Sequence, residues 1–349
     1  MFSKNLRYYR LKNKMSKSEL ASKCNLTATA ISNYENGKRQ PSIDQLKLLA
    51  KVLGVKVSDF LAIRNENLVF VHGEFRKNSK LTKGNQDYIR DSVEEYFGRF
   101  FNAVEVLGGE VLPEAPKSHV ITLSDNDEKN AKLLRAHLGL AESGPINEII
   151  SILENKGILV YEFNHSDERY SDFSGMNGLV NGRPYIVING SMTPERNRST
   201  IVHELSHIFF SWPSDMEEKE IEQHATAISG AFLFPEDDAI RELGQNRSNI
   251  TNDMLKVCVE YGVSMMLLVK RAEILGIVSH STALKFYIAA SQHHWRTNEP
   301  SRIEKEKPSL LEQLVYRAVS EQDISIQKGA ELLKMPYNLV ADICDYVEV

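Results

Sequence analysis

A short segment in the second half of the chain has the residue types and spacing of a metal site. Residues 203–207 read His-Glu-Leu-Ser-His. Positions four apart in a helix lie one turn apart on the same face, so His203 and His207 can bind one ion. Glu204 lies outside this pair and can take a proton from a water molecule at the metal. The pattern therefore predicts a zinc site that hydrolyses amide bonds, with Glu204 as the general base.

The residues around this motif are apolar. Positions 201, 202, 205 and 208–210 carry only Ile, Val, Leu and Phe. Such a helix is expected to be buried, and buried histidines need polar partners. A chance occurrence of the motif would leave both histidines without partners, which favours metal binding.

A third protein ligand is required if one position is to stay open for water. The next predicted helix, from residue 217 to about 234, has an inward apolar stripe that contains Ala225. Glu222 lies three residues earlier on the same side, and we predict it as the ligand. Glu218, one turn earlier on this face, is the alternative, whereas His224 is rotated about 100° from Ala225.

The motif and its surroundings resemble the ImmA/IrrE family of zinc metallopeptidases, which occurs in bacterial regulators and mobile elements. Residues 182–200 resemble the strand and loop before the family's motif helix. Residues 222–235 resemble its acid-bearing helix, and the likeness covers roughly residues 129–289. The chain differs at Ser206, where many members have glycine, and at His224, where many have a second glutamate.

This resemblance implies roles for individual residues. In the family, two histidines and a later glutamate bind zinc, and the glutamate between the histidines is the base. Carried over to this chain, the zinc ligands are His203, His207 and Glu222, and the catalytic base is Glu204.

Charge is distributed unevenly along the chain. The 349 residues carry a net charge of −5, but residues 1–62 carry +8 and the remainder −13. A compact basic module joined to an acidic body is typical of a nucleic-acid-binding domain fused to a second domain. We therefore expect a nucleic acid to bind the first 62 residues, and the helix-turn-helix spacing described next indicates that it is double-stranded DNA.

The basic segment has the spacing of two short helices separated by a tight turn. Ser16 to Glu19 has the pattern of a capping box, Thr27 can cap the second helix, and Asn36-Gly37 can end it. This is helix-turn-helix spacing. Apolar residues at helical intervals predict a small core of Leu6, Tyr9, Ile31, Tyr34, Ile43, Leu46, Leu49, Ala50 and Leu53.

Nearly all of residues 3–61 resemble the Xre/Cro-type helix-turn-helix family, above all residues 31–39. In that docking mode the second helix enters the major groove, with two half-sites about 34 Å apart, so we expect a homodimer. The alternative is a basic bundle that binds a protein. The predicted DNA-binding residues are Lys17, Thr27, Ala28, Thr29, Ser32, Asn33, Lys38 and Arg39, with Lys17, Lys38 and Arg39 on phosphates.

The remaining sequence predicts a mostly helical α+β protein with a zincin-like peptidase domain. A strand at 157–163 and a hairpin turning at Asn181-Gly182 indicate a small sheet packed on helices. An edge strand above the zinc is expected to bind a peptide by strand addition. The predicted parts are a helix-turn-helix domain (1–62), a linking region (63–126), a metallopeptidase domain (127–290), and a linker with a helical tail (291–349).

Composition indicates a cytoplasmic protein. The apolar content of 42% can support cores for two or three domains. Cys24, Cys258 and Cys344 lie far apart without disulfide or metal spacing. No stretch approaches the roughly 18 apolar residues of a membrane-spanning helix.

These observations favour a DNA-binding transcriptional regulator with a zinc-dependent endopeptidase domain that acts on a protein such as a repressor or toxin. The family resemblance implies a stress, mobile-element or toxin–antitoxin setting. One alternative is a non-catalytic regulator or antitoxin in which the zinc domain is a scaffold or sensor. Another is an autoprotease that cuts its own chain within Val111–Asp125.

Overall fold

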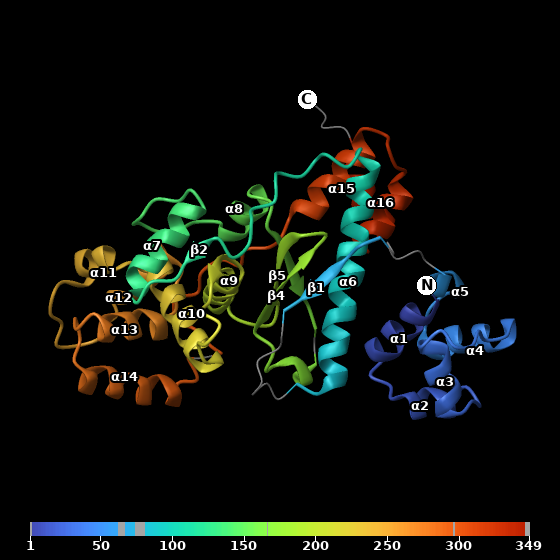
Figure 1. Ribbon diagram of the computed structural model, residues 1–349, viewed down its shortest axis with the longest axis horizontal. Coiled ribbons are helices and arrows are strands. Elements are labelled where there is room, and N and C mark those ends of the chain that lie inside the picture. Colours follow the sequence, from blue (N-terminus) through green and yellow to red (C-terminus); the bar gives the residue numbers. More distant parts are fainter. Residues whose placement is uncertain (1, 62–66, 74–80, 166, 296, 346–349) are drawn as a thin grey trace.

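The computed structural model describes residues 2–61, 67–73, 81–165, 167–295 and 297–345 (Figure 1). Helices predominate, and a four-stranded mixed sheet lies near the middle of the molecule, so the predicted α+β class is confirmed. No helix in these ranges combines the length and apolar character needed to cross a membrane.

Five short helices form the N-terminal bundle. Ser16 and Glu19 make the predicted capping box, and Thr27 caps the next helix. Most of the predicted core is buried, but Ile43 is 72% exposed. It is the first residue of its helix, where the chain has only just turned toward the core. The helices are α1 (Phe2–Lys12), α2 (Lys17–Lys23), α3 (Ala28–Glu35), α4 (Ile43–Leu53) and α5 (Val57–Leu61).

The sheet has the strand order β1-β4-β5-β3. β4 is antiparallel to both β1 and β5, whereas β3 and β5 are parallel. Asn181 and Gly182 form the predicted hairpin turn, with positive φ angles of 50° and 76° as a two-residue turn of this type requires. The strands are β1 (Phe70–His72), β3 (Leu159–Phe163), β4 (Gly175–Val180) and β5 (Arg183–Asn189).

The described parts of the segment predicted to link the two domains, residues 67–73 and 81–126, pack against the second domain. β1 pairs with β4, and α6 (Lys83–Val106) packs against the sheet through Phe97 and Phe100. β2 (Ile121–Thr122) pairs in parallel with β6 (Phe210–Ser211). These contacts join residues about 100 positions apart. The local sequence of residues 63–126 therefore does not indicate them, and this region was predicted to be a linking region.

The motif helix α9 lies between the sheet and a second layer of helices (Figure 1). It contacts β4 and β5 on one side and α10 on the other, and α10 also contacts α7. The remaining elements of this unit are α7 (Asp127–His137), α8 (Ile149–Asn155), the 3-10 helix η1 (Glu168–Tyr170), α9 (Pro194–Phe209), α10 (Glu218–Leu233), α11 (Glu236–Leu243), α12 (Met254–Tyr261), α13 (Met265–Ile274) and α14 (His280–Gln292).

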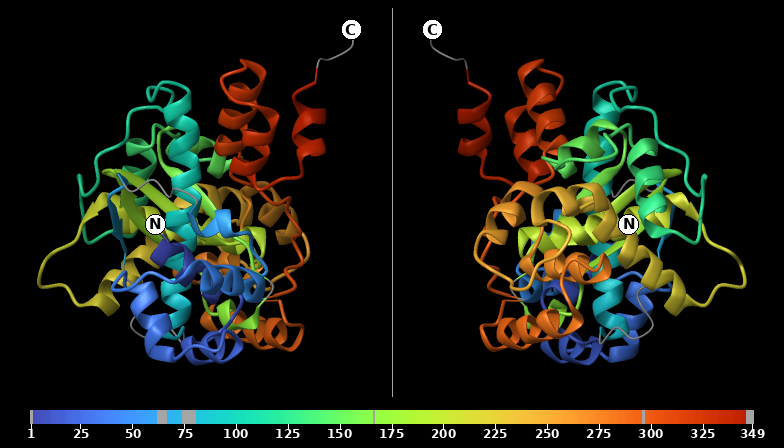
Figure 2. Two further views of the ribbon diagram at one scale, coloured as in Figure 1. Left: turned by 90° about the vertical axis from the view of Figure 1, so that its right-hand side faces the viewer. Right: turned by 90° about the vertical axis from the view of Figure 1, so that its left-hand side faces the viewer.

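The C-terminal helices pack on α6 instead of forming a separate tail (Figures 1 and 2). The polar segment before them, which resembles a linker in composition, is tied to the second domain. Glu154 accepts hydrogen bonds from the backbone N–H groups of Ser309 and Leu310 where the first of these helices begins. The helices are α15 (Leu310–Ser320), α16 (Ile326–Leu333) and α17 (Tyr337–Ile343).

Candidate metal centre and DNA-binding surface

Helix α9 starts with strong local signals and is then held by burial. The Thr193 side chain caps it, and Pro194 occupies the first turn, where its missing N–H costs nothing. Val202 and Leu205 are fully buried between the sheet and α10. The backbone that carries His203, Glu204 and His207 is therefore rigidly placed.

The three predicted metal ligands lie together. The Nε2 atoms of His203 and His207 are 3.2 Å apart. Carboxylate oxygens of Glu222 lie 3.5 Å from Nε2 of His203 and 3.3 Å from Nε2 of His207. Tetrahedral zinc, with bonds of about 2.0–2.1 Å, separates its ligand atoms by roughly 3.3 Å. The spacing and the His, His, Glu chemistry therefore fit a zinc ion.

The two other residues weighed for this role lie elsewhere. Within the described ranges, His203, His207 and Glu222 are the one group of metal-binding side chains that meets within 4.8 Å. Glu218 is the exposed first residue of α10. His224 is directed toward α7, where its Nδ1 lies 2.8 Å from the carboxylate of Asp127.

Thr226 supports two of the ligands from the next turn of α10. Its hydroxyl donates to the carbonyl oxygen of Glu222 at 2.8 Å and lies 3.5 Å from Nδ1 of His203. A hydroxyl that accepts from Nδ1–H keeps Nε2 of His203 unprotonated and able to bind a metal. Thr226 is not among the residues predicted from the sequence, although its i, i+4 spacing from Glu222 places it on the same face of α10.

Glu204 is held between the motif helix and strand β4. It is 7% exposed, and its Oε2 accepts a hydrogen bond of 2.8 Å from Nδ2 of Asn177. Gly175 allows this close approach, because a Cβ there would lie 2.5 Å from Cγ2 of Thr200. Asn177 was also missed, since it lies 27 residues before Glu204 and meets it only through the sheet.

The expectation of an open edge strand above the metal is wrong for most of β4. Its outer edge from Gly178 to Val180 is paired with β1, and Gly73 N–H donates to the Asn177 carbonyl at 2.8 Å. A strand already hydrogen-bonded on both sides cannot receive a further peptide there. Gly175 and Met176 are the β4 residues whose outer edge has no strand partner among the described residues.

Apart from Lys17 on α2, the predicted DNA-binding residues lie between Thr27, which caps α3, and the turn after this helix. Thr27, Ala28 and Thr29 are exposed, and the Thr27 hydroxyl also accepts the Ala30 N–H at 3.1 Å. Ser32 and Asn33 are half-buried one turn later. Lys38 and Arg39 are exposed in the turn that follows the helix.

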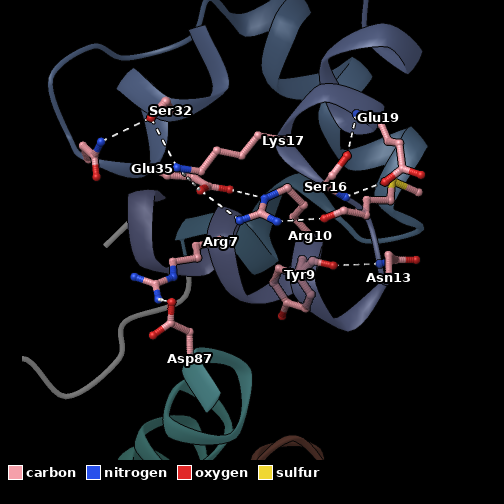
Figure 3. A network of polar contacts seen from close by, with 12 residues as sticks. Arg7, Tyr9, Arg10, Asn13, Ser16, Lys17, Glu19, Ser32, Glu35 and Asp87 are labelled. Carbon is pink, nitrogen blue, oxygen red and sulfur yellow. Dashed lines mark hydrogen bonds and ion pairs between the residues drawn. The ribbon is translucent and has the colours of Figure 1, made fainter. Parts of the chain in front are cut away.

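A buried charge network fixes the position of α3 (Figure 3). Arg10 of α1 forms a bidentate pair with Glu35 at the end of α3, and it also donates to the Met15 carbonyl at 2.7 Å. Lys17 was expected to bind phosphate. Its Nζ lies 3.3 Å from the Ser32 hydroxyl and 3.8 Å from the Glu35 carboxylate.

The basic bundle docks on the acidic side of α6 (Figures 1 and 3). Arg7 contacts Asp87 at 2.8 Å and Asp91 at 3.5 Å. Tyr8 stacks on Tyr88 with ring centroids 6.1 Å apart. Arg7 of α1 is thus paired with carboxylates of α6, whereas α3 is not part of these contacts.

Protein families match both parts of the chain. Residues 6–60 match the family model described as helix-turn-helix, and residues 153–273 match the one described as IrrE N-terminal-like domain. The chain is 40% identical over 62 residues to the control protein C.BamHI of Bacillus amyloliquefaciens, an alignment that covers 18% of this chain and 76% of that protein. The chain therefore belongs to the helix-turn-helix family of DNA-binding regulators through its N-terminal domain, and residues 153–273 form a domain of the IrrE N-terminal-like family.

Proposed function

We propose that this protein is a DNA-binding transcriptional regulator whose second domain is a zinc-dependent endopeptidase. The observation that carries the proposal is the meeting of His203, His207 and Glu222 beside a buried Glu204. A zinc ion held by these three side chains would polarise the scissile carbonyl and lower the pKa of water. The substrate is proposed to be a protein, such as a repressor or a toxin.

Glu204 performs the proton transfers in this proposal. Its carboxylate accepts a proton from the attacking water and passes it to the leaving amine. Asn177 donates to one carboxylate oxygen, which orients the side chain and leaves the other oxygen to take the proton. Burial of Glu204 keeps its carboxylate from rotating freely in solvent.

The DNA-binding part of the proposal rests on the family match and on the exposed surface of α3. Ala28, Thr29, Ser32 and Asn33 would reach base edges, while Lys38 and Arg39 would bind phosphates. Lys17 would have to leave Ser32 and Glu35 to do the same. The likeness to a control protein supports a regulatory role. Because helix-turn-helix proteins commonly read two half-sites, we propose that the protein acts as a homodimer on double-stranded DNA in the cytoplasm.

Zinc content and Glu204 dependence test the proposal together. Elemental analysis of protein purified without chelator should find about one zinc per chain, as a single site of this type requires. His203→Ala should lose the zinc, whereas His293→Ala, at an exposed position on α14's C-terminal side, should retain it. No zinc, even after supplementation, would reject the peptidase.

Catalysis is tested separately with Glu204→Gln, which should keep the zinc. New protein N-termini, identified by mass spectrometry in cells that express the wild type, should be absent with this variant. Identical N-termini in both cultures would instead support a scaffold or sensor role. A fragment of the chain itself that ends within Val111–Asp125 would identify self-cleavage.

A further inference from the structure

A large groove is lined by one of the three metal ligands, Glu222. It has a volume of about 960 Å³ and lies between α10, α13 and α14. Glu222 and Thr226 form its wall on the side of the metal ligands. A peptide whose scissile bond lies at the metal would therefore place its neighbouring residues in this groove.

Small residues on α10 make room for an apolar side chain. Ala227 and Gly230 line the groove opposite Met266, Leu267 and Ile274. At Gly230 a Cβ would lie only 3.0 Å from Cδ of Arg271, so the absence of a side chain there lets Arg271 lie across α10. The walls are thus suited to a large aliphatic or aromatic side chain, because they would remove its surface from water.

Three of the four charged side chains that line this space are cationic, and the fourth is the metal ligand Glu222. Lys219 is exposed at the rim, and it has no ion-pair partner within the described parts of the chain. Lys270 also lines the groove and pairs with Glu273 at 3.1 Å.

Arg271 adds a buried donor to the wall. This side chain is 4% exposed and pairs with Glu128, and its Nε donates to the Phe234 carbonyl at 3.0 Å. Its Nη2 has no hydrogen-bond partner among the residues that the structure describes. Cationic donors of this kind are best matched by a carboxylate.

We propose that this groove is a substrate subsite that accepts a large apolar residue followed closely by an acidic residue. The occupant is the protein substrate of the proposed peptidase, and the inference rests on that proposed function. The apolar residue packs against Leu267 and Met266, and the carboxylate lies near Lys219. The groove thereby selects which bond of a protein is brought to the metal.

Cleavage of designed peptides tests this selectivity. The probes are quenched fluorescent dodecapeptides with a central Leu-Glu, Leu-Lys or Leu-Ser pair and otherwise randomised positions. We expect zinc-loaded protein to prefer the Leu-Glu set, and Lys219→Glu to lower this kcat/KM about fivefold and raise that for Leu-Lys. Lys256→Glu makes the same charge change at an exposed position of α12 outside the groove and should leave both values unchanged.

Filling the groove tests the apolar part. Ala227→Phe should lower cleavage of every Leu-containing set by at least about tenfold. Ala136→Phe makes the same change at an exposed position of α7 outside the groove and should leave cleavage unchanged. Zinc content should stay at the wild-type value in both variants. Unaltered cleavage in Ala227→Phe, or an unaltered preference in Lys219→Glu, would overturn the subsite.

Binding to Glu204→Gln separates this inference from the proposed function. Fluorescence anisotropy should show that the Leu-Glu peptides bind this variant, and that a second change of Ala227→Phe abolishes binding. If this holds but the wild type cleaves nothing, the peptidase proposal fails and the groove stands as a peptide-binding site. If peptides are cleaved but Ala227→Phe does not change binding of the Leu-Glu peptides, the groove proposal fails and the peptidase proposal is retained. Loss of a dimer in Ala227→Phe, seen by sedimentation, would identify a second copy of the chain as the occupant of the groove. This result would also overturn the subsite proposal.

Discussion

At the scale of single residues, the candidate site depends on side chains that no motif includes. Glu204 is adjacent to a metal ligand in the sequence, but its carboxylate is oriented by Asn177 of β4. Thr226 similarly contacts His203 from a different helix. Supporting contacts of this kind commonly change affinity or activity by about 10–100-fold.

We predict that Asn177→Ala lowers kcat by about tenfold or more and leaves KM and zinc content unchanged. The reason is that Glu204 loses the hydrogen bond that orients it, whereas the metal ligands keep their contacts. Steady-state kinetics and elemental analysis measure the two effects. Asn252→Ala, at an exposed position before α12, is the control. Zinc loss in Asn177→Ala would contradict a role confined to Glu204.

A second prediction at this scale concerns the exposed cations after α3. Replacing both Lys38 and Arg39 by alanine should weaken DNA binding uniformly across sequences and reduce the slope of log K against log salt by about 2. Asn33→Ala should instead change which sequences are preferred. Binding to selected and random duplexes over a salt series measures both. A salt slope that does not change in the double variant would argue against phosphate contacts.

At the scale of elements, contacts between distant residues determine strand pairing and helix packing that local sequence patterns do not predict. β1 has only three residues, yet it closes most of the β4 edge. The C-terminal helices are held where Glu154 of α8 accepts hydrogen bonds from the first N–H groups of α15. Burial raises the pKa of Glu154 to about 7, although these two hydrogen bonds act to lower it.

Glu154 should make stability depend on pH. The pKa of Glu154 is raised in the folded state. Its contribution to the free energy of unfolding is therefore fully present below about pH 4.5 and is lost as pH rises through about 7. Glu154→Gln keeps an oxygen that accepts the two N–H groups and has no charge to bury. Over this pH range, we expect the free energy of unfolding of the wild type to fall by up to about 3 kcal/mol relative to that of Glu154→Gln.

Thermal unfolding at pH 5 and pH 8 measures this difference. Glu312→Gln, on the exposed side of α15, is the matched control and should keep the wild-type dependence. Parallel pH profiles for Glu154→Gln and the wild type would contradict the assignment.

At the scale of the whole molecule, the basic bundle and the second domain are joined by opposite charges. Arg7 contacts Asp87 and Asp91 on α6, and Lys14 contacts Asp167 at 2.7 Å. Exposed ion pairs are individually weak and are screened by salt. The docked arrangement should therefore be in equilibrium with more open ones.

We predict that Arg7→Glu increases the radius of gyration at low salt, because it replaces attraction to Asp87 and Asp91 by repulsion. Small-angle X-ray scattering measures the change, and Asp87→Arg in the same chain should partly reverse it. Lys47→Glu, on the exposed side of α4, makes the same charge change away from α6. Equal radii for wild type and Arg7→Glu would indicate that the remaining contacts, such as the Tyr8–Tyr88 stack and the Lys14–Asp167 pair, hold the domains together.

The sequence by itself determined the elements whose signals are local. The capping box at Ser16, the Asn181-Gly182 turn and the four-residue spacing of His203 and His207 are each satisfied within a few residues. Helical periodicity also placed Glu222 on the inner face of α10, because the neighbouring apolar residues define that face. The division into a basic bundle and a second domain followed from charge, since charge can be counted along the chain.

Only the tertiary structure decided the features that join distant residues. Asn177 meets Glu204, β1 pairs with β4, and residues that resemble linkers pack into the core, because sheet pairing and burial connect positions far apart in the sequence. Such contacts depend on the relative placement of whole elements, which no local pattern encodes. The groove beside Glu222 exists for the same reason, since residues from four separate helices line it.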